Sequence, residues 1–308
     1  TVRIWNATSG EERHVLKGHS SPVTSVAIQG DTIVSGSGEF FWTTDNTVRI
    51  WNATTGEEQH VLKGHSDWVS SVAIDGDTIV SGSDDKTVRI WNATSGEEQH
   101  VLKGHSWGVN SVAIQGDIIV SGSNDKTSCI WNTTSDEEPH VLKGHSSRVN
   151  SVAIQGKTIV SGSGWVFSTD NTVRIWNATS GEEQRVLEGH SGEVHSVAIQ
   201  GDIIASGSTD KTVRIWNATS GEEKHVLEGH SNWVRSVAIQ GNIIVSGSTD
   251  KTVRIWNATS GEEQHVLKGH SDWVRSVAIQ GDTIVSGSSD NTVRIWNATS
   301  GEEQHVLK

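Results

Sequence analysis

Residues 64–103 read GHSDWVSSVAIDGDTIVSGSDDKTVRIWNATSGEEQHVLK, and this stretch recurs with few changes along the chain. The string TVRIWN begins at residues 1, 47, 87, 172, 212, 252 and 292, with the variant TSCIWN at residue 127. Successive intervals are 46, 40, 40, 45, 40, 40 and 40 residues, so the period is 40 with insertions in two units. A fixed period of this length is typical of repeat folds.

Each repeat contains four segments with the pattern of short strands. Residues 69–74 alternate between two faces with a period of two, as a strand requires. Residues 79–83, 87–92 and 97–103 are three further strand candidates, separated by Gly, Asn, Asp and Ser at turns. Helical periodicity is absent. Four strands in a 40-residue unit, repeated seven times, predict the blades of a β-propeller.

The predicted fold class is all-β: a seven-bladed β-propeller of four-stranded antiparallel blades. Residues 1–17 supply an extra half-unit at the N-terminus, because they copy only the third and fourth strands. We treat the whole of residues 1–308 as a single domain, since no segment between the repeats resembles a linker. The predicted repeat units are residues 18–63, 64–103, 104–143, 144–188, 189–228, 229–268 and 269–308.

Because of the half-unit, the sequence does not determine which strand completes the last blade of the propeller. Both ends of the chain carry a near-identical copy of the outer strand, so either copy could complete the last blade. A swapped dimer formed through the half-unit, or a longer parent protein with more repeats, would also account for the surplus strands. We therefore expect a monomer or a swapped dimer, and a chain that begins at Thr1 is expected to be a piece of something longer.

The Gly-His that opens each unit and the Ile-Trp-Asn that closes its third strand resemble the WD-repeat β-propellers, with Asn where the family usually has Asp. The resemblance covers the whole chain. It implies a hydrogen-bonded tetrad of His, Ser, Asp and Trp in each blade, in which Ser accepts from the Trp indole and Asp orients the His. The tetrads are His19, Ser35, Asp45 and Trp51; His65, Ser81, Asp85 and Trp91; His105, Ser121, Asp125 and Trp131; His145, Ser161, Asp170 and Trp176; His190, Ser206, Asp210 and Trp216; His230, Ser246, Asp250 and Trp256; and His270, Ser286, Asp290 and Trp296.

Ser, His and Asp also make the catalytic triads of hydrolases. Such a triad needs an exposed nucleophile and an oxyanion hole, and one copy suffices. Seven equal copies, each tied to a Trp, favour a structural role. We expect no catalytic residue, no cofactor and no metal site, because the outer-strand histidines lie in separate blades and cannot converge on one ion.

The net charge of the chain indicates which partners are unfavoured, and its cysteine content indicates the cellular compartment. The chain has 37 acidic and 24 basic residues, for a formal net charge of −13. Nucleic acid and anionic membrane surfaces are therefore unfavoured partners. The one cysteine, Cys129, fits a reducing compartment, so we expect a cytoplasmic protein. The recurring Asn-Ala-Thr is interpreted as a turn rather than a glycosylation site.

Differences among the repeats concentrate in two loops. We call the residues between Gly-His-Ser and the first strand the leading loop, and those between the second and third strands the middle loop. In the propeller topology both loops lie on one face, where WD-repeat proteins commonly bind partners. Surface drift is the alternative explanation, but drift would also scatter through the NATSGEE turns, which are nearly constant. The pattern thus favours a recognition rim on that face.

The residue types on this rim match those of interface hot spots, which are rich in Trp and Arg. Insertions in the middle loops of blades 1 and 4 add aromatic residues, which would either contact a partner or fold over the axial channel. The candidate rim residues are Trp68, Trp107, Arg148, Glu193, His195, Trp233, Arg235, Asp272, Trp273 and Arg275, with Phe40, Phe41, Trp42, Trp165 and Phe167 from the insertions.

The sequence therefore predicts a non-catalytic protein- or peptide-recognition propeller. The Trp and Arg residues of blades 6 and 7 suggest an acidic or aromatic-bearing peptide. By analogy, the chain would be the sensor or scaffold domain of a larger signalling or immunity protein. Two alternatives remain: an inert structural spacer, and a carbohydrate-binding propeller that uses Trp side chains as stacking platforms.

Overall fold

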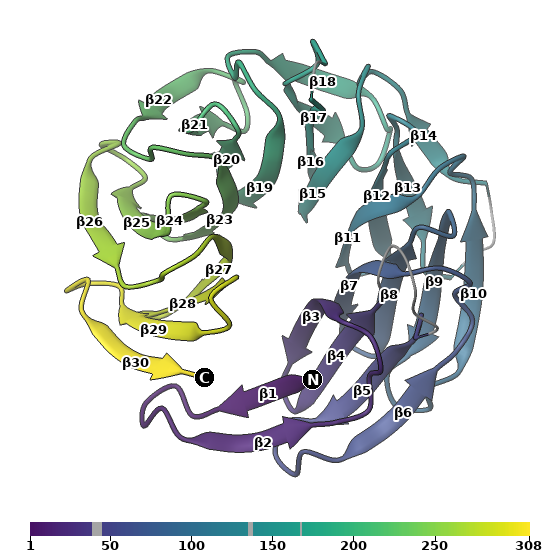
Figure 1. Ribbon diagram of the computed structural model, residues 1–308. Coiled ribbons are helices and arrows are strands. Elements are labelled where there is room, and N and C mark those ends of the chain that lie inside the picture. Colours follow the sequence, from purple (N-terminus) through teal and green to yellow (C-terminus); the bar gives the residue numbers. More distant parts are fainter. Residues whose placement is uncertain (39–44, 135–137, 167) are drawn as a thin grey trace. The chain divides into compact units, whose positions relative to one another are not determined.

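The structure is a computed structural model that describes residues 1–38, 45–134, 138–166 and 168–308. These residues form 30 strands joined by turns and bends (Figure 1). The described residues contain no helix. They therefore include no helix that is long and apolar enough to cross a membrane.

The strands make seven four-stranded antiparallel sheets and one two-stranded sheet, which confirms the predicted all-β, seven-bladed propeller with a half-unit. The half-unit and blades 1 to 3 are β1 (Val2–Trp5), β2 (Glu12–Leu16); β3 (Val23–Gln29), β4 (Thr32–Ser37), β5 (Val48–Asn52), β6 (Glu58–Leu62); β7 (Val69–Asp75), β8 (Thr78–Ser83), β9 (Thr87–Asn92), β10 (Glu98–Lys103); β11 (Val109–Gln115), β12 (Ile118–Ser123), β13 (Ser128–Asn132) and β14 (His140–Leu142). Blades 4 to 7 are β15 (Val149–Gln155), β16 (Thr158–Ser163), β17 (Val173–Asn177), β18 (Glu183–Leu187); β19 (Val194–Gln200), β20 (Ile203–Ser208), β21 (Val213–Asn217), β22 (Glu223–Leu227); β23 (Val234–Gln240), β24 (Ile243–Ser248), β25 (Thr252–Asn257), β26 (Glu263–Lys268); β27 (Val274–Gln280), β28 (Thr283–Ser288), β29 (Val293–Asn297) and β30 (Glu303–Leu307).

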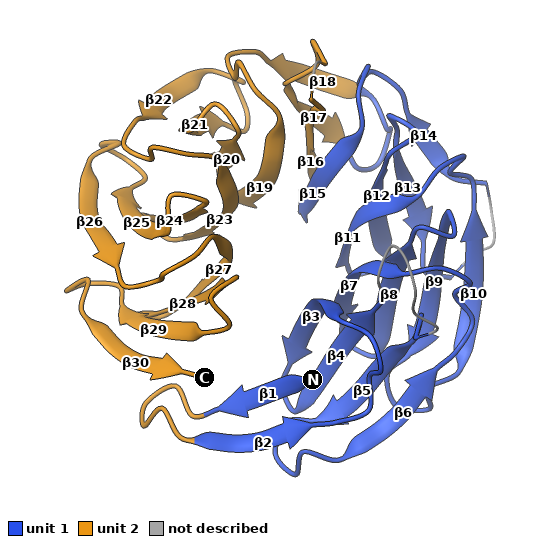
Figure 2. Ribbon diagram, in the orientation of Figure 1, with its two compact units in different colours: residues 1–5, 12–157, 178–182 blue, residues 6–11, 158–177, 183–308 orange. Residues whose placement is uncertain are grey.

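The chain divides into two compact units (Figure 2). Unit 1 comprises residues 1–5, 12–157 and 178–182, which hold the half-unit strands, blades 1 to 3 and β15. Unit 2 comprises residues 6–11, 158–177 and 183–308, which hold β16 to β18 and blades 5 to 7.

The last blade takes its outer strand from the C-terminus. In unit 2, β30 pairs with β29, with Leu307 opposite Val293. In unit 1, β1 and β2 pair with each other as a separate two-stranded sheet, with Leu16 opposite Val2. The sequence had left open which copy of the strand would complete the last blade, and the structure uses β30.

The hydrophobic core lies between successive blades. In unit 1, one cluster joins Val34 and Ile50 of blade 1 to Val69, Val72 and Trp91 of blade 2. An equivalent cluster in unit 2 joins blades 5 and 6. Strands that alternate with a period of two present one such row of apolar side chains to the next blade. Each blade is therefore stabilised by its neighbours rather than by a core of its own.

A glycine in the second strand allows this close packing. A Cβ added to Gly36 would lie 2.6 Å from Cγ1 of Val69 in the next blade. Real Cβ atoms do not approach that closely, so a side chain at Gly36 would push the blades apart. Gly82 and Gly122 in unit 1, and Gly207 and Gly247 in unit 2, approach the equivalent Val of the next blade equally closely, whereas Gly287 in blade 7 meets no atom within 4 Å.

Hydrogen bonds repeat from blade to blade in the same way. The Val72 amide donates to Ser25 Oγ at 3.1 Å, and the Val112 amide donates to Ser71 Oγ at the same distance. In unit 2 the Val237 amide donates to Ser196 Oγ at 3.2 Å. One type of contact therefore recurs at successive interfaces within each unit.

Candidate recognition site

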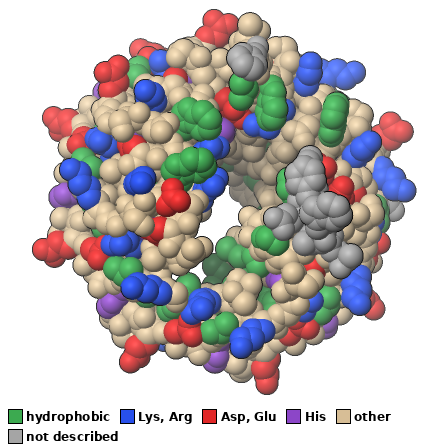
Figure 3. All heavy atoms as spheres, in the orientation of Figure 1, with side chains coloured by type: hydrophobic (Ala, Val, Ile, Leu, Met, Phe, Trp, Pro, Cys, Tyr) green, Lys and Arg blue, Asp and Glu red, His purple; other side chains and the backbone are tan. Residues whose placement is uncertain are grey.

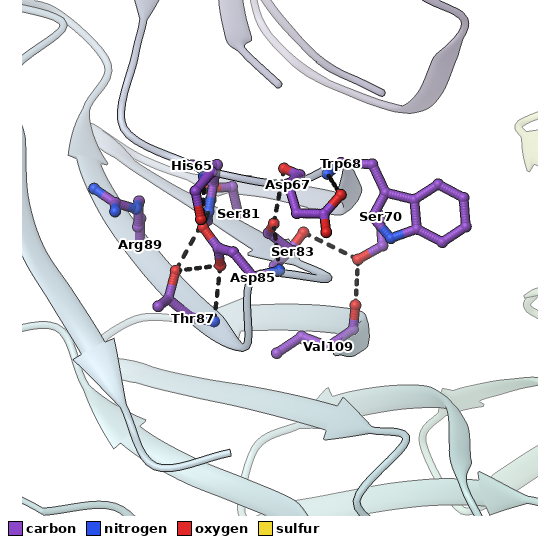
Figure 4. Close-up of polar contacts among 12 residues, drawn as sticks. His65, Asp67, Trp68, Ser70, Ser81, Ser83, Asp85, Thr87, Arg89 and Val109 are labelled. Carbon is purple, nitrogen blue, oxygen red and sulfur yellow. Dashed lines mark hydrogen bonds and ion pairs between the residues drawn. The ribbon is translucent and has the colours of Figure 1, made fainter. Parts of the chain in front are cut away.

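The tetrad side chains come together inside the blades. In blade 2, Ser81 Oγ lies 2.7 Å from His65 Nε2, and His65 Nδ1 lies 2.8 Å from Asp85 Oδ2 (Figure 4). The Trp91 indole donates to Ser81 Oγ at 2.9 Å. The same three contacts measure 2.7–3.0 Å in blades 1, 3, 5, 6 and 7. In blade 4, Trp176 donates to Ser161 Oγ at 2.8 Å.

The tetrad carboxylates are held in their charged form. Burial alone would raise the pKa of Asp85, but hydrogen bonds from His65 and Thr87 outweigh it and hold that pKa well below its ordinary value. The pKa values of Asp125, Asp210 and Asp250 are lowered for the same reasons. Burial also lowers the pKa of His19, against the opposing effect of the hydrogen bond that His19 donates to the Asp45 carboxylate.

Backbone hydrogen bonds join the leading and middle loops within blades 5, 6 and 7. In unit 2 the Thr209 amide donates to the Glu193 carbonyl, the Thr249 amide to the Trp233 carbonyl, and the Ser289 amide to the Trp273 carbonyl, each at 2.9 Å. The loops that differ most among the repeats are therefore neighbours on one face. The space-filling view shows hydrophobic side chains exposed on this face over blades 5 and 6 (Figure 3).

Blades 6 and 7 each present an Arg stacked on a Trp. The Arg235 Cζ lies 4.8 Å from the ring centroid of Trp233, and the Arg275 Cζ lies 4.9 Å from that of Trp273. Both Trp side chains stay accessible, with 41% and 40% of their surface exposed. A cation over an aromatic face holds both side chains in place. Asp272 contributes to the loop, because its Oδ1 accepts from the Trp273 amide at 2.8 Å.

A pocket of about 280 Å³ lies in unit 2, where the middle loop of blade 4 meets the leading loops of blades 5 and 6. Trp165 and Trp233 line it, and each exposes a large part of its ring. Glu193 also lines the pocket, although only 6% of its surface is exposed. The further lining residues are Val166, Ser168, Asn171, Ser191, Gly192, Thr209 and Asp210.

Close backbone contact brings the blade 4 loop to Glu193. Gly164 has a φ of +152°, and a Cβ added there would lie 2.5 Å from the Cα of Glu193. Only glycine combines that conformation with that approach. The insertion that follows Gly164 therefore places Trp165 beside the leading loop of blade 5.

The pocket's carboxylate contacts His195, which in turn lies beside Arg235 and Trp233. His195 Nδ1 lies 3.6 Å from Glu193 Oε1, and His195 Nε2 lies 3.3 Å from Arg235. The imidazole of His195 is 6.2 Å from the Trp233 ring. Glu193, His195, Trp233 and Arg235 thus form one connected cluster in unit 2.

The other predicted rim residues are not part of this unit 2 cluster. In unit 1, Trp107 is 62% exposed, whereas Trp68 and Arg148 are half-buried. Trp68 projects away from the tetrad of its blade (Figure 4). The structure does not bring these three into the pocket lining of unit 2. Phe40, Phe41, Trp42 and Phe167 lie outside the described residues.

Several pocket residues escaped the sequence interpretation. Asn171, Ser191 and Thr209 line the pocket but were not among the candidates. A signal existed for Asn171, because the residue after the tetrad Asp is Asn in blades 1, 4 and 7 and Lys in the others. Within the described ranges, no group of three or more His, Cys, Asp or Glu is placed to hold a metal ion.

Comparison with known proteins identifies the repeat. The chain is similar to the computationally designed Ika8 protein, whose crystal structure matches with a TM-score of 0.84 and 30% sequence identity, over 94% of this chain and 88% of that chain. A search of the curated proteins returned no match. The model of the WD domain, G-beta repeat, matches residues 10–52, 56–92, 96–132, 136–177, 181–217, 221–257 and 261–297. With the tetrads and blades described above, these matches establish that the chain belongs to the WD domain, G-beta repeat family.

Proposed function

We propose that the chain is a non-catalytic module that recognises a protein or peptide through the unit 2 rim. This name covers Trp165, Glu193, Trp233, Arg235, Trp273 and Arg275. WD-repeat propellers are typically protein-interaction scaffolds and are generally not enzymes.

The observation that carries the proposal is the exposure of three Trp side chains in one unit. Trp165, Trp233 and Trp273 expose 51%, 41% and 40% of their surface. Large aromatic side chains cost free energy when they face water, and clustered exposure marks interaction sites. The stacked Arg235 and Arg275 reduce the freedom that binding would otherwise remove.

The tetrad Ser is poorly suited to act as a nucleophile. Ser206 is completely buried, and its hydroxyl contacts both His190 and the Trp216 indole. A catalytic Ser needs an open approach for substrate and an oxyanion hole beside it. Burial of this hydroxyl therefore supports the non-catalytic assignment.

Selection of a random-peptide phage library on the purified chain tests the proposal. We expect Trp233→Ala to weaken binding of a selected peptide about tenfold or more, since rim Trp residues are frequent hot spots. Trp107→Ala is the matched control, because Trp107 is also exposed but belongs to unit 1. Recovery of no peptide, or equal binding by the Trp233→Ala variant, would overturn the proposal.

A glycan array separates this function from carbohydrate binding. Arg235 and Arg275 already cover one face of Trp233 and Trp273, so each indole offers a sugar one face rather than two. Peptide recognition predicts that no glycan depends on Trp233 for binding. A glycan that bound the chain and was lost in Trp233→Ala would replace peptide recognition by sugar recognition.

A further inference from the structure

We infer that the unit 2 pocket receives a cationic side chain, lysine or arginine, of the bound peptide, with Glu193 as the counter-charge and Trp165 and Trp233 as aromatic walls. The inference rests on the proposed function and names the chemistry of one contact within it. It differs from the acidic or aromatic peptide that the blade 6 and 7 sequence suggested.

The first observation that supports a cationic ligand is the acidic side chain of Glu193. The residue just before the first strand is Pro22, Trp68, Gly108, Arg148, Trp233 or Trp273 in the other blades, so blade 5 alone has an acid there. The Glu193 side chain is 94% buried yet lines a pocket. A carboxylate in so dry a place interacts more strongly with a cation than one at an open surface.

The balance of charge in the pocket points the same way. Its lining contains two carboxylates, Glu193 and Asp210, and no Lys or Arg. Hydrogen bonds from His190 and Thr212 outweigh burial and keep the pKa of Asp210 low, so this carboxylate is charged at neutral pH. Arg235 and His195 lie outside the lining. On the pocket side a ligand group therefore meets the carboxylates of Glu193 and Asp210, of which Glu193 also contacts His195 at 3.6 Å.

The aromatic walls suit a cation as well. Trp is the strongest cation–π acceptor among the side chains, and the pocket has two. Trp233 already accepts one cation, because the Arg235 guanidinium lies 4.8 Å from its ring centroid. A carboxylate combined with indole rings matches the alkyl stem and charged end of Lys or Arg.

The size of the pocket favours one side chain over a whole small molecule. Its 280 Å³ falls just below the roughly 300–1,000 Å³ of typical small-molecule sites. A side chain that belongs to a peptide fills less space than a free ligand, while its backbone remains on the surrounding rim. The pocket is thus a specificity pocket within a wider peptide site.

The test uses Nα-acetyl-arginine methylamide and Nα-acetyl-lysine methylamide as probes, with the citrulline and norleucine derivatives as neutral counterparts. Binding is followed by ¹⁹F NMR of protein labelled with 5-fluorotryptophan. Trp165→Phe and Trp233→Phe assign the two signals. We expect the cationic probes to shift the signals of Trp165 and Trp233, and the neutral probes to leave them in place.

Glu193→Gln supplies the decisive comparison, because it keeps the size of the side chain and removes its charge. We expect this variant to lose about tenfold or more in affinity for the arginine probe, as charged hydrogen-bonded pairs usually do. Glu188→Gln, an exposed acid of the same unit, is the control and should bind like the wild type. The other Trp signals report whether the variant is folded.

The outcomes separate the inference from the proposed function. Equal shifts with citrulline, or unchanged affinity in Glu193→Gln, would overturn the cationic pocket. A selected peptide that depends on Trp233 but lacks Lys and Arg, and binds Glu193→Gln normally, would also overturn it while leaving peptide recognition intact. Failure of the phage selection alone would count against peptide recognition, because the probe titration reports on the pocket independently.

Discussion

Val26 and Val72 hold the same position in the first strands of consecutive blades, yet Val26 is 58% exposed and Val72 only 6%. Val72 packs against Gly36 in the second strand of blade 1. The half-unit that precedes Val26 in the chain consists of β1 and β2 and has no equivalent of that second strand. The same residue type in the same repeat position therefore has two different energetic roles.

This relationship gives a matched pair of substitutions. Val72→Ala should lower the free energy of unfolding by about 2 kcal/mol, because it removes two buried methyl groups and leaves a cavity. Val26→Ala should change it by less than about 0.5 kcal/mol, as expected for an exposed position. Urea unfolding followed by Trp fluorescence measures both. Equal effects of the two substitutions would contradict the role given to the interface between blades.

The tetrad makes a second prediction. Asp85→Ala should destabilise the protein by about 1–3 kcal/mol, because His65, Thr87 and the Ser66 amide each lose an acceptor. Differential scanning calorimetry should show a lower Tm. Asp77→Ala is the control, since Asp77 is exposed, keeps its backbone carbonyl for the Ala93 amide, and loses only an exposed 3.4 Å contact from the Thr94 hydroxyl among its described hydrogen bonds. An unchanged Tm in Asp85→Ala would mean that the tetrad does not stabilise the blade.

Acid should unfold the protein through these carboxylates. The pKa of Asp85 and its equivalents is lowered in the folded state, so they contribute stability above the unfolded pKa of about 3.9, and this stability is lost as the pH falls further. We expect the urea midpoint to drop steeply below about pH 4. Asp85→Asn should show a shallower drop than the wild type, because one such carboxylate is absent. A midpoint independent of pH in the acid range would refute this account.

The thiol of Cys129 should be unreactive in the native protein. Only 1% of the residue is exposed, and burial raises the pKa of its thiol to about 12. The thiolate is the reactive form, so native Cys129 should react far more slowly with a disulfide reagent than the same thiol in urea. Rapid labelling of the folded protein, measured by absorbance, would show that blade 3 opens readily.

The blades were predictable from the sequence because their contacts are periodic. The spacing between Ser81 and Trp91 recurs in the blades without an insertion, and each blade packs on a near-copy of itself, so local pattern and tertiary environment agree. The choice of outer strand for blade 7 was not predictable. The two candidate strands differ at one position, Arg13 against Gln304, and so have nearly the same intrinsic preference.

The pocket was only partly predictable, because it depends on contacts between loops that differ from blade to blade. Trp165, Glu193 and Trp233 were recognised as variable positions. The burial of Glu193 follows from the approach of Gly164, which belongs to a different blade and carries no periodic signal. A repeat pattern in the sequence does not determine how loops that differ from blade to blade contact one another.

The recurring bond from a Val amide to the Ser Oγ of the preceding blade has a consequence for how such a protein changes over generations. Val72 with Ser25, Val112 with Ser71 and Val277 with Ser236 make the same contact, so the interfaces they belong to are interchangeable. Recombination that adds or removes one 40-residue repeat inside a unit joins two surfaces that already fit each other. A repeat with a different leading loop can therefore be inserted by recombination as a complete unit, and the neighbouring blades need no compensating mutation.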